Sequence, residues 1–392
     1  MEVTGLNIIF FCGSLEPRCD GVGDYIRRLA GELVQQGHSA TLISLNDSFV
    51  KREIVGKQCV GKIELTVVRI PSVMPNVKKV RCIKNWVEKL HPDWLSLQFV
   101  PFAYHSKGLP FTLCFFLMKV GKGRKWHIMF HELWVGMEIN SSLKAIVWGT
   151  LQQVVIKLLQ VNLRPLVYHT QSSLYQLQLA KLGIESKCLP LFSNIPIANN
   201  VVIRQENSTL LYNEGKKIFF VLFGGIHPGA PIEEFTEEAA LFALENNVQL
   251  VLRIVGRCGP EQENWVKTWR AKGLDFELCG EQPAKGVSEL LANASIGLTT
   301  TPIALVEKSG TVAAMREHGL PVFCIRNTWK ARGVKEFSVP AGIYQYQPGN
   351  FKDLFMHKGE VDCISTVSSV CKTFIDDISN ASCNCKSNHQ DI

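Results

Sequence analysis

Short apolar runs alternate along this chain with longer segments whose apolar residues recur at helical spacing. A nearly continuous apolar run is typical of a strand that is buried on both faces of a parallel sheet. In the first half, the runs that we interpret as strands are residues 6–12, 40–45, 63–70, 94–99, 126–130, 166–169 and 188–191. A helix is expected from about Asp24 to the break at Gly37, because its apolar residues fall on one stripe.

The same alternation resumes after residue 217. Strands are expected at residues 218–223, 248–255, 276–279, 294–299, 322–325 and 343–346, and helices at residues 232–245, 288–292, 309–317 and 361–378. Two alternating series of strands and helices predict an α/β protein with two parallel-sheet domains.

The composition of the segment between the two series indicates the domain boundary. Residues 197–217 are rich in Asn, Ser and charged side chains, which is typical of a linker. We therefore expect an N-terminal domain over residues 1–196 and a C-terminal domain over residues 218–345. A helical segment over 346–380 and a disordered polar tail over 381–392 complete the predicted organisation.

Overall composition narrows the class of protein. The chain has 392 residues, 46% apolar and 20% charged, as in a soluble globular protein. We expect no signal peptide, and no apolar run is long enough to predict a membrane-spanning helix. Most of the 13 cysteines sit singly inside apolar runs, which favours a reducing cytoplasm without structural disulfides or zinc. The net charge of +7 suits anionic ligands or an anionic membrane surface.

The stretch 294–325 carries the clearest functional pattern. It reads as strand, loop, helix, turn and strand, and the helix starts at Ser309, Gly310 and Thr311. Backbone N–H groups in the first turn of a helix lack partners inside that helix, so they can bind an anion such as a phosphate. Gly310 permits close approach, and Lys308 adds positive charge. The alternative interpretation is an ordinary serine cap on a packed helix.

A glycine-bearing loop follows the first predicted strand. It contains Gly13, Gly21 and Gly23, but their spacing differs from that of the dinucleotide-binding fingerprint. The opening of the chain therefore predicts a strand–helix–strand unit and argues against an NAD-dependent enzyme.

His131 and Glu132 follow the predicted strand at 126–130. In open α/β sheets, the carboxyl ends of the strands line the ligand crevice, so this position makes His131 a candidate catalytic residue. The alternative interpretation is an ordinary histidine of the surface or the core.

Several segments occur in the order found in a known family. They are GVGDYIRRLAGELVQQGHSATLISL (21–45), HPDWLSLQFVPF (91–102), FHE (130–132), LPLFSNIP (189–196) and GLPVFC (319–324). In this order they resemble the GT-B glycosyltransferases, and among them the group 1 enzymes of glycosyltransferase family 4. The likeness covers roughly residues 5–345.

The resemblance implies two Rossmann-like domains that face each other across a cleft, with a C-terminal helix that crosses back to the first. It implies transfer of a sugar from a nucleotide-sugar donor to a polysaccharide, lipid-linked or other glycan acceptor, with retention of configuration. A cytoplasmic enzyme is expected, with association at the inner face of a membrane as one alternative. We expect no cofactor and no nucleic-acid partner. The chain has no Asp-x-Asp motif of the kind that metal-dependent transferases use, so no essential metal is expected either.

The resemblance also implies roles for individual residues. His131 would contact the donor sugar or its phosphate, and Asp24 and Glu132 are the candidate bases if the enzyme inverts. The glycines of the first loop would let the backbone approach the phosphate and the acceptor. The residues expected to bind the donor are Gly13, Gly21, Gly23, Gly225, Arg257, Glu281, Glu307, Lys308, Ser309, Gly310 and Thr311.

Two departures from the family pattern keep other functions open. The loop GGIHPGAPIEEF (224–235) lacks the Arg and Lys that usually hold the nucleotide diphosphate. Met315 stands where the second of two paired glutamates usually meets the ribose. The rival hypotheses are therefore another GT-B enzyme, such as a nucleotide-sugar epimerase or hydrolase, and a non-catalytic binding protein derived from the fold.

Overall fold

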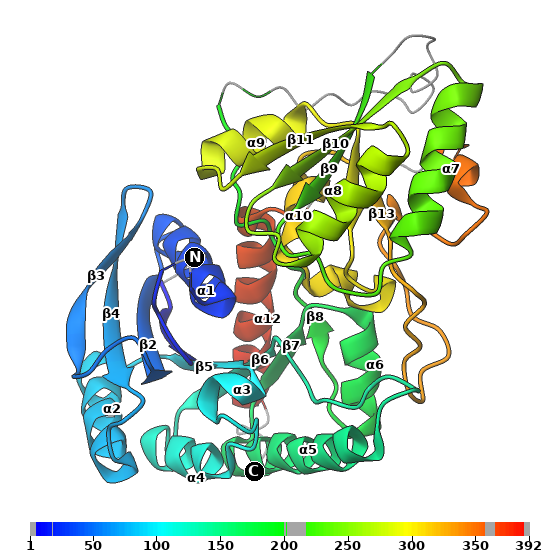
Figure 1. Cartoon of the computed structure of the whole chain (residues 1–392). Coiled ribbons are helices and arrows are strands. Elements are labelled where there is room, and N and C mark those ends of the chain that lie inside the picture. Colours follow the sequence, from blue (N-terminus) through cyan, green and yellow to red (C-terminus); the bar gives the residue numbers. More distant parts are fainter. Residues whose placement is uncertain (1–4, 18, 200, 202–216, 357–364, 388–392) are drawn as a thin grey trace. The chain divides into compact units, whose positions relative to one another are not determined.

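The computed structural model describes residues 5–17, 19–199, 201, 217–356 and 365–387 (Figure 1). The chain forms two compact units. The first unit comprises Met1–Pro190, Ala331–Lys335 and Val367–Ile392, and the second comprises Leu191–Lys330 and Glu336–Thr366. Two segments from the second half of the chain therefore belong to the first unit.

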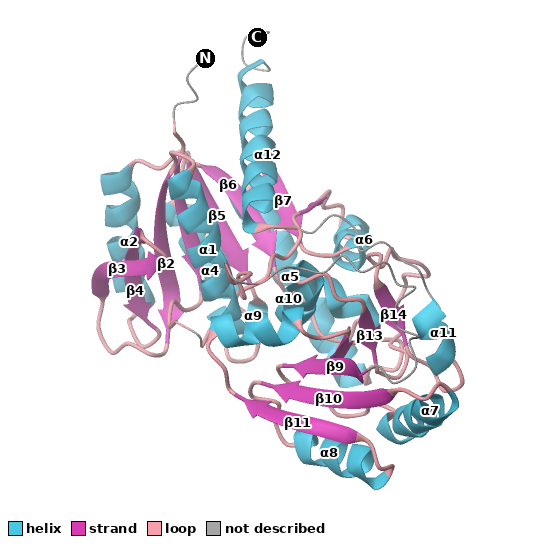
Figure 2. Ribbon diagram, turned by 90° about the horizontal axis from the view of Figure 1, so that it is seen from above, coloured by secondary structure: helices cyan, strands magenta, loops and turns pink. Residues whose placement is uncertain are grey.

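The first unit is built on an eight-stranded sheet with the order β3-β4-β2-β1-β5-β6-β7-β8 (Figure 2). The strands are β1 (Asn7–Cys12), β2 (Ser39–Asp47), β3 (Ile54–Val60), β4 (Ile63–Pro71), β5 (Trp94–Phe99), β6 (Lys125–Phe130), β7 (Val167–Thr170) and β8 (Lys187–Cys188). All neighbouring strands pair in parallel except β3 and β4. Every residue of β5 is buried, as its apolar run predicts for a central parallel strand.

Helices cover both faces of this sheet. They are α1 (Gly21–Gln35), α2 (Asn76–Leu90), α3 (Pro101–Tyr104), α4 (Phe111–Val120), α5 (Leu143–Leu163), α6 (Ser173–Lys181) and α12 (Val367–Ser387). Helices α1 and α12 lie together on one face, and α2, α4 and α5 lie on the other (Figure 1).

The hairpin of β3 and β4 contains a strand that the apolar pattern did not predict. The side chains of β3 are exposed or half-buried along its whole length, and it pairs antiparallel with β4. An edge strand of this kind has no continuous apolar run, so hydrophobicity alone gives no signal for it.

The second unit has a six-stranded parallel sheet with the order β11-β10-β9-β12-β13-β14. Its strands are β9 (Lys217–Phe223), β10 (Gln249–Val255), β11 (Asp275–Gly280), β12 (Ile296–Thr299), β13 (Val322–Cys324) and β14 (Ile343–Gln345). Its helices are α7 (Ile232–Glu245), α8 (Glu261–Ala271), α9 (Ala284–Ala292), the short 3-10 helix η2 (Ile303–Lys308), α10 (Gly310–Glu317) and α11 (Phe351–Met356).

Alternate residues of β9 feed two hydrophobic cores, one on each face of this sheet. Phe220 packs with aromatic residues of α7, α8 and α11, such as Phe235 and Trp269. Val221 points to the opposite face, where it packs with residues of α9 and α10 such as Met315. A sheet that is covered on both faces is the doubly wound arrangement that the sequence predicted.

The C-terminal helix differs from the sequence prediction in its extent. Helix α12 begins at Val367 and continues to Ser387, so residues 381–387 are helical and not a disordered tail. Residues 357–364 and 388–392, also covered by those predictions, lie outside the described residues, as does most of the linker at 202–216. The first stretch of the first unit ends at Pro190, earlier than the predicted boundary at residue 196.

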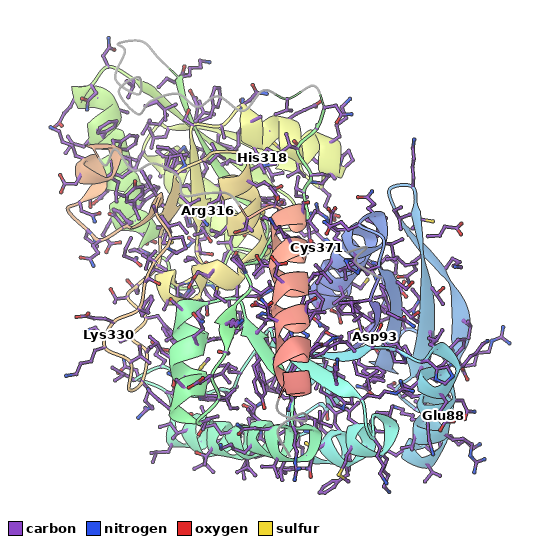
Figure 3. All side chains as sticks on the ribbon, turned by 180° about the vertical axis from the view of Figure 1, so that it is seen from behind. Glu88, Asp93, Arg316, His318, Lys330 and Cys371 are labelled. Carbon is purple, nitrogen blue, oxygen red and sulfur yellow. The ribbon has the colours of Figure 1, made fainter. Side chains whose placement is uncertain are left out.

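Helix α12 is part of the core of the first unit. Phe374 is fully buried, and its ring lies 6.0 Å from that of Phe10 on β1 and 5.1 Å from that of His127 on β6. Cys371, labelled on α12 in Figure 3, is also fully buried. Lys125 Nζ donates to Ser382 Oγ at 2.9 Å. Ser382 lies within the stretch 381–392 that was expected to be disordered, and this hydrogen bond joins it to β6 instead.

Helix α5 packs in the core along one side and is apolar on the other. Val155, Ile156 and Leu159 are buried. Leu143 and Val147 on the same helix are exposed. No helix in the described part of the chain combines the length and the apolar character that crossing a membrane requires.

A buried ion pair holds the loop between β1 and α1. The carboxylate of Asp47 is fully buried and accepts hydrogen bonds from the backbone N–H of Leu15 and from Arg69 Nε, at 3.1 and 2.8 Å. Burial alone would raise the pKa of Asp47, but the hydrogen bonds from Arg69 and from backbone N–H groups outweigh it, so the pKa lies below its usual value. The loop that precedes α1 is therefore fixed from β2.

The core position of α12 predicts a large cost for removing Phe374. We expect Phe374→Ala to lower the free energy of unfolding by about 3–5 kcal/mol, as for other buried aromatic side chains. Chemical denaturation measures this, with Lys372→Ala, at an exposed position of α12, as the control. A loss below about 1 kcal/mol would contradict the packing of α12 against β1 and β6.

The Asp47–Arg69 pair predicts a pH-dependent cost. At pH 7, Asp47→Asn should lower the free energy of unfolding by about 3–5 kcal/mol, because Arg69 loses its buried partner. A carboxyl with a depressed native pKa stabilises the fold above its unfolded pKa of about 3.9, and this contribution disappears as the pH falls through the native value. The gap between wild type and variant should therefore narrow below about pH 4. Glu64→Gln, at an exposed position of β4, is the matched control, and equal losses in both variants would refute the role of the pair.

Candidate functional site

His131 lies at the carboxyl end of β6, as predicted, and is held from two sides. Its Nε2 lies 2.8 Å from Oε1 of Gln98 on β5. Its ring meets that of Tyr25 on α1 edge to face, with centroids 5.0 Å apart. The side chain of His131 is buried, whereas that of the neighbouring Glu132 is exposed. The structure thus fixes the orientation of His131 and leaves Glu132 at the surface.

Helix α1 begins earlier than expected, at Gly21, because Asp20 caps it. The carboxylate of Asp20 accepts the N–H groups of Val22 and Gly23, each at 2.9 Å. Burial is the main cause that raises the pKa of Asp20. The predicted base Asp24 lies in the first turn of α1 and forms an ion pair with Arg27.

Two of the three glycines in this loop are explained by packing. A Cβ on Gly13 would lie 2.6 Å from that of Ala103 on α3, and one on Gly23 would lie 2.8 Å from the carbonyl oxygen of Ser14. A Cβ on Gly21 would meet nothing within 4 Å. Of the three, only Gly21 borders open space, so it is the one whose backbone a ligand could approach.

In the second unit, the loop from Gly224 to Gly229 touches residues that follow β12. Gly224 has a φ of +82°, and a Cβ there would lie 2.7 Å from the Thr311 side chain at the start of α10. The N–H of His227 donates to Thr300 Oγ1, after β12, at 2.8 Å. Gly225 has no atom within 4 Å of the position of a Cβ. The predicted residues Gly225 and Thr311 are therefore brought to one edge of the sheet.

The start of α10 agrees with the sequence prediction. Ser309 is the N-cap, and its Oγ accepts from Val312 N at 3.4 Å and lies 3.0 Å from Thr311 Oγ1. A Cβ on Gly310 would meet nothing within 4 Å. Glu307 and Lys308 end the short helix η2 directly before this cap. The serine cap of the alternative interpretation is thus present, and it leaves room beside the first helical residue.

Arg257 and Glu281 lie further along the same edge. Arg257 follows β10 and Glu281 follows β11, and their side chains pair at 3.4 Å between Nε and Oε2. The two side chains are 76% and 68% exposed, so solvent screens the pair strongly. Either side chain can therefore exchange this partner for a ligand at little cost.

Arg326 is a candidate that sequence reasoning missed. It follows β13, and its Nη1 lies 3.5 Å from where a Cβ on Gly229 would be. This nitrogen is buried and has no hydrogen-bond partner among the residues that the structure describes. The family pattern directed attention to the loop 224–235, which has no Arg or Lys. The signal that could have identified Arg326 was its place directly after the apolar run at 322–325.

Met315 is buried in the core and explains one departure from the family pattern. A Cβ on Gly297 of β12 would lie 2.5 Å from Met315 Sδ, so the methionine occupies the space that this glycine leaves. An apolar contact with the sheet stands where a carboxylate was expected. Within the described residues, no group of three or more His, Cys, Asp or Glu side chains is placed to hold a metal ion.

Comparisons with known proteins give likeness in structure only. No family model and no curated protein sequence matches the chain. Among solved structures, the lipopolysaccharide outer core galactosyltransferase WaaB has a TM-score of 0.52 and 14% identity, covering 96% of this chain and 99% of that chain. HepE from Anabaena, bound to UDP and glucose, has a TM-score of 0.53 and 14% identity, covering 99% and 100%.

A third similar structure is the catalytic domain of starch synthase IV from Arabidopsis thaliana, bound to ADP and acarbose. Its TM-score is 0.54 at 12% identity, and the match covers 96% of this chain and 99% of that chain. At such low identity these matches establish the fold, and they span both units of the chain. The protein therefore has the GT-B fold, with two Rossmann-like domains, that these structures share.

Proposed function

We propose that the protein is a glycosyltransferase that takes a sugar from a nucleoside diphosphate donor. The observation that carries this proposal is the cluster at the carboxyl edge of the second sheet, where Gly224–Gly229, Thr300, the start of α10 and Arg326 come together. The fold matches add support, because HepE was solved with UDP and starch synthase IV with ADP. In an open α/β sheet this edge is where nucleotides bind.

The chemistry of this edge suits a diphosphate leaving group. Negative charge grows on the leaving phosphate as the glycosidic bond breaks, so fixed donors and cations there lower the barrier. The start of α10 offers backbone N–H groups and the Ser309 and Thr311 hydroxyls. Arg326 supplies a guanidinium beside the loop that lacks the usual basic residues. We assign Arg257 and Lys308 to the same donor site, with Glu281 near the nucleobase.

His131 is assigned to the donor sugar in the first unit. Its buried ring is held by Gln98 and Tyr25, which keeps it in one orientation. We propose transfer with retention and without a metal or cofactor, to a polysaccharide, lipid-linked or other glycan acceptor. In that case no dedicated base is needed. The ion pair of Asp24 with Arg27 and the exposure of Glu132 support this choice over inversion.

A non-catalytic binding protein is the second candidate. It is favoured by Met315, which puts a buried apolar side chain where the family places a carboxylate for the ribose. A nucleotide-sugar epimerase or hydrolase is the third, and it would consume donor without an acceptor. Turnover separates these candidates, because only the binding protein leaves every donor intact.

Thermal unfolding against a panel of nucleoside diphosphates and their sugar conjugates tests the binding site. A ligand at about 100 times its Kd stabilises the native state by about 2.7 kcal/mol, which raises the unfolding midpoint clearly. Arg326→Gln should lower the affinity for the stabilising ligand by about tenfold to a hundredfold, because a charge-assisted hydrogen bond is lost. Arg270→Gln, at an exposed position of α8, should not change its affinity. A flat response across the panel would contradict the proposal.

Turnover of the donor identified in this way tests the roles in the first unit. His131→Ala should lower kcat by about a hundredfold or more when it is assayed at a temperature where the variant remains folded. Glu132→Gln should keep most of the activity if transfer proceeds with retention. Treatment of the wild-type enzyme with EDTA should also leave most of the activity, because no metal is proposed. Full activity of His131→Ala would remove His131 from the mechanism, and a dead Glu132→Gln enzyme would favour inversion.

A further inference from the structure

A chain of buried polar side chains connects His131 to the C-terminal helix. Its members, in order, are His131, Gln98, Ser96, His127, His169 and Asp377. The successive heavy-atom distances are 2.8, 2.8, 2.8, 3.0 and 2.9 Å. These residues, which we call the buried polar chain, come from β5, β6, β7, α12 and the end of β6. It lies entirely within the first unit.

The interior members of this chain are almost completely shielded from water. Ser96 and His169 are 0% exposed, and Gln98 and His127 are 1% exposed. A buried polar atom without a partner is costly, so each link has to pair a donor with an acceptor. The direction of every hydrogen bond is therefore determined once one end is known.

Asp377 defines that end. The largest cause that lowers the pKa of Asp377 is the hydrogen bond from His169, and Lys187 on β8 pairs with the same carboxylate. An ionised carboxylate only accepts, so His169 Nε2 carries the proton and donates it. In a neutral ring, His169 Nδ1 then has to accept, and the donor is His127 Nε2.

The same reasoning carries the direction on to His131. Burial holds the pKa of His127 well below its usual value, so this ring is neutral and its Nδ1 accepts the proton of the Ser96 hydroxyl. The oxygen of Ser96 in turn accepts from Gln98 Nε2. Gln98 Oε1 is left to accept from His131 Nε2. With His169 neutral, every group thus donates toward Asp377, and His131 is the Nε2–H tautomer with its lone pair on Nδ1.

The opposite direction requires a different charge on His169. If Gln98 turned its amide N–H toward His131 Nε2, then Ser96 would donate to Gln98 and His127 Nδ1 would donate to Ser96. His127 Nε2 would then accept from His169, which would need a proton on both ring nitrogens. The groups that face His169 are Asp377 and Phe374 from α12 and His127 from β6, and Lys187 from β8 reaches Asp377. The state of His169 at α12 therefore decides which nitrogen of His131 bears its proton.

We propose that Asp377 on the C-terminal helix is a positioning residue for His131, which it holds as the Nε2–H tautomer through the buried polar chain. Nδ1 of His131 is then a hydrogen-bond acceptor, which suits a hydroxyl of the donor and not a phosphate oxygen. This rests on the proposed function, in which His131 contacts the donor sugar. The Gln98 amide does not pass protons along, so the chain fixes a tautomer and is not a proton relay.

Nitrogen NMR of the full chain with 15N-labelled histidine tests this directly, because the ring shifts distinguish the two tautomers. The His131 signals are assigned by their loss in His131→Ala. In wild type at pH 7.5, His131, His127 and His169 should all be Nε2–H tautomers. In Asp377→Asn, an amide that can donate or accept replaces the carboxylate, so His131 should become a mixture of tautomers. Asp376→Asn, at the exposed neighbouring position, should leave His131 as in wild type.

Ser96→Ala interrupts the buried polar chain in its middle without changing α12. In this variant too, His131 should become a mixture of tautomers. In a turnover assay, Asp377→Asn should lower kcat by about tenfold with little change in KM, and Asp376→Asn should change neither. An Nδ1–H tautomer of His131 in wild type would overturn the proposal. So would His131 ring signals that stay unchanged in both Asp377→Asn and Ser96→Ala. If the tautomers behave as described but no donor is ever turned over, the proposed function fails and the tautomer control stands.

Discussion

Parallel pairing of strands is the constraint on which the candidate sites of this molecule depend. In both units, the strands around the candidate residues run the same way, so their carboxyl ends share one edge of the sheet. This places His131 beside Gln98 in the first unit. In the second unit it brings the loop after β9 against Thr311 and Arg326, residues that are distant in sequence. Each unit thus brings its candidate residues together at the carboxyl edge of its own sheet.

Much of this arrangement could be predicted from the sequence. Buried parallel strands leave continuous apolar runs, and β5 occurs at the residues that its run predicted. Helix α7 also occurs at the predicted residues. The cap of α10 was also readable, because a serine followed by glycine before an amphipathic segment is a local signal. The edge strand β3 left no such signal, since its side chains are exposed or half-buried.

What the sequence could not show depends on contacts between distant residues. Arg326 becomes a candidate only when its guanidinium is placed next to Gly229. The hydrogen bond between His169 and Asp377 joins positions 208 residues apart, and nothing local in either segment predicts it. The polar composition after residue 380 suggested disorder, whereas buried Phe374 and the Lys125–Ser382 hydrogen bond fix α12 on the first unit. Tertiary packing has overridden the local composition there.

The central claim is that a nucleoside diphosphate binds at the carboxyl edge of the second sheet. Hydrogen–deuterium exchange of the whole chain, with and without the nucleotide that stabilises it, tests this most directly. The claim predicts that slowed exchange concentrates in the loop at 224–229 and in the first turn of α10, because their backbone N–H groups meet the phosphates. Protection that spares both segments and appears elsewhere in the chain would contradict it.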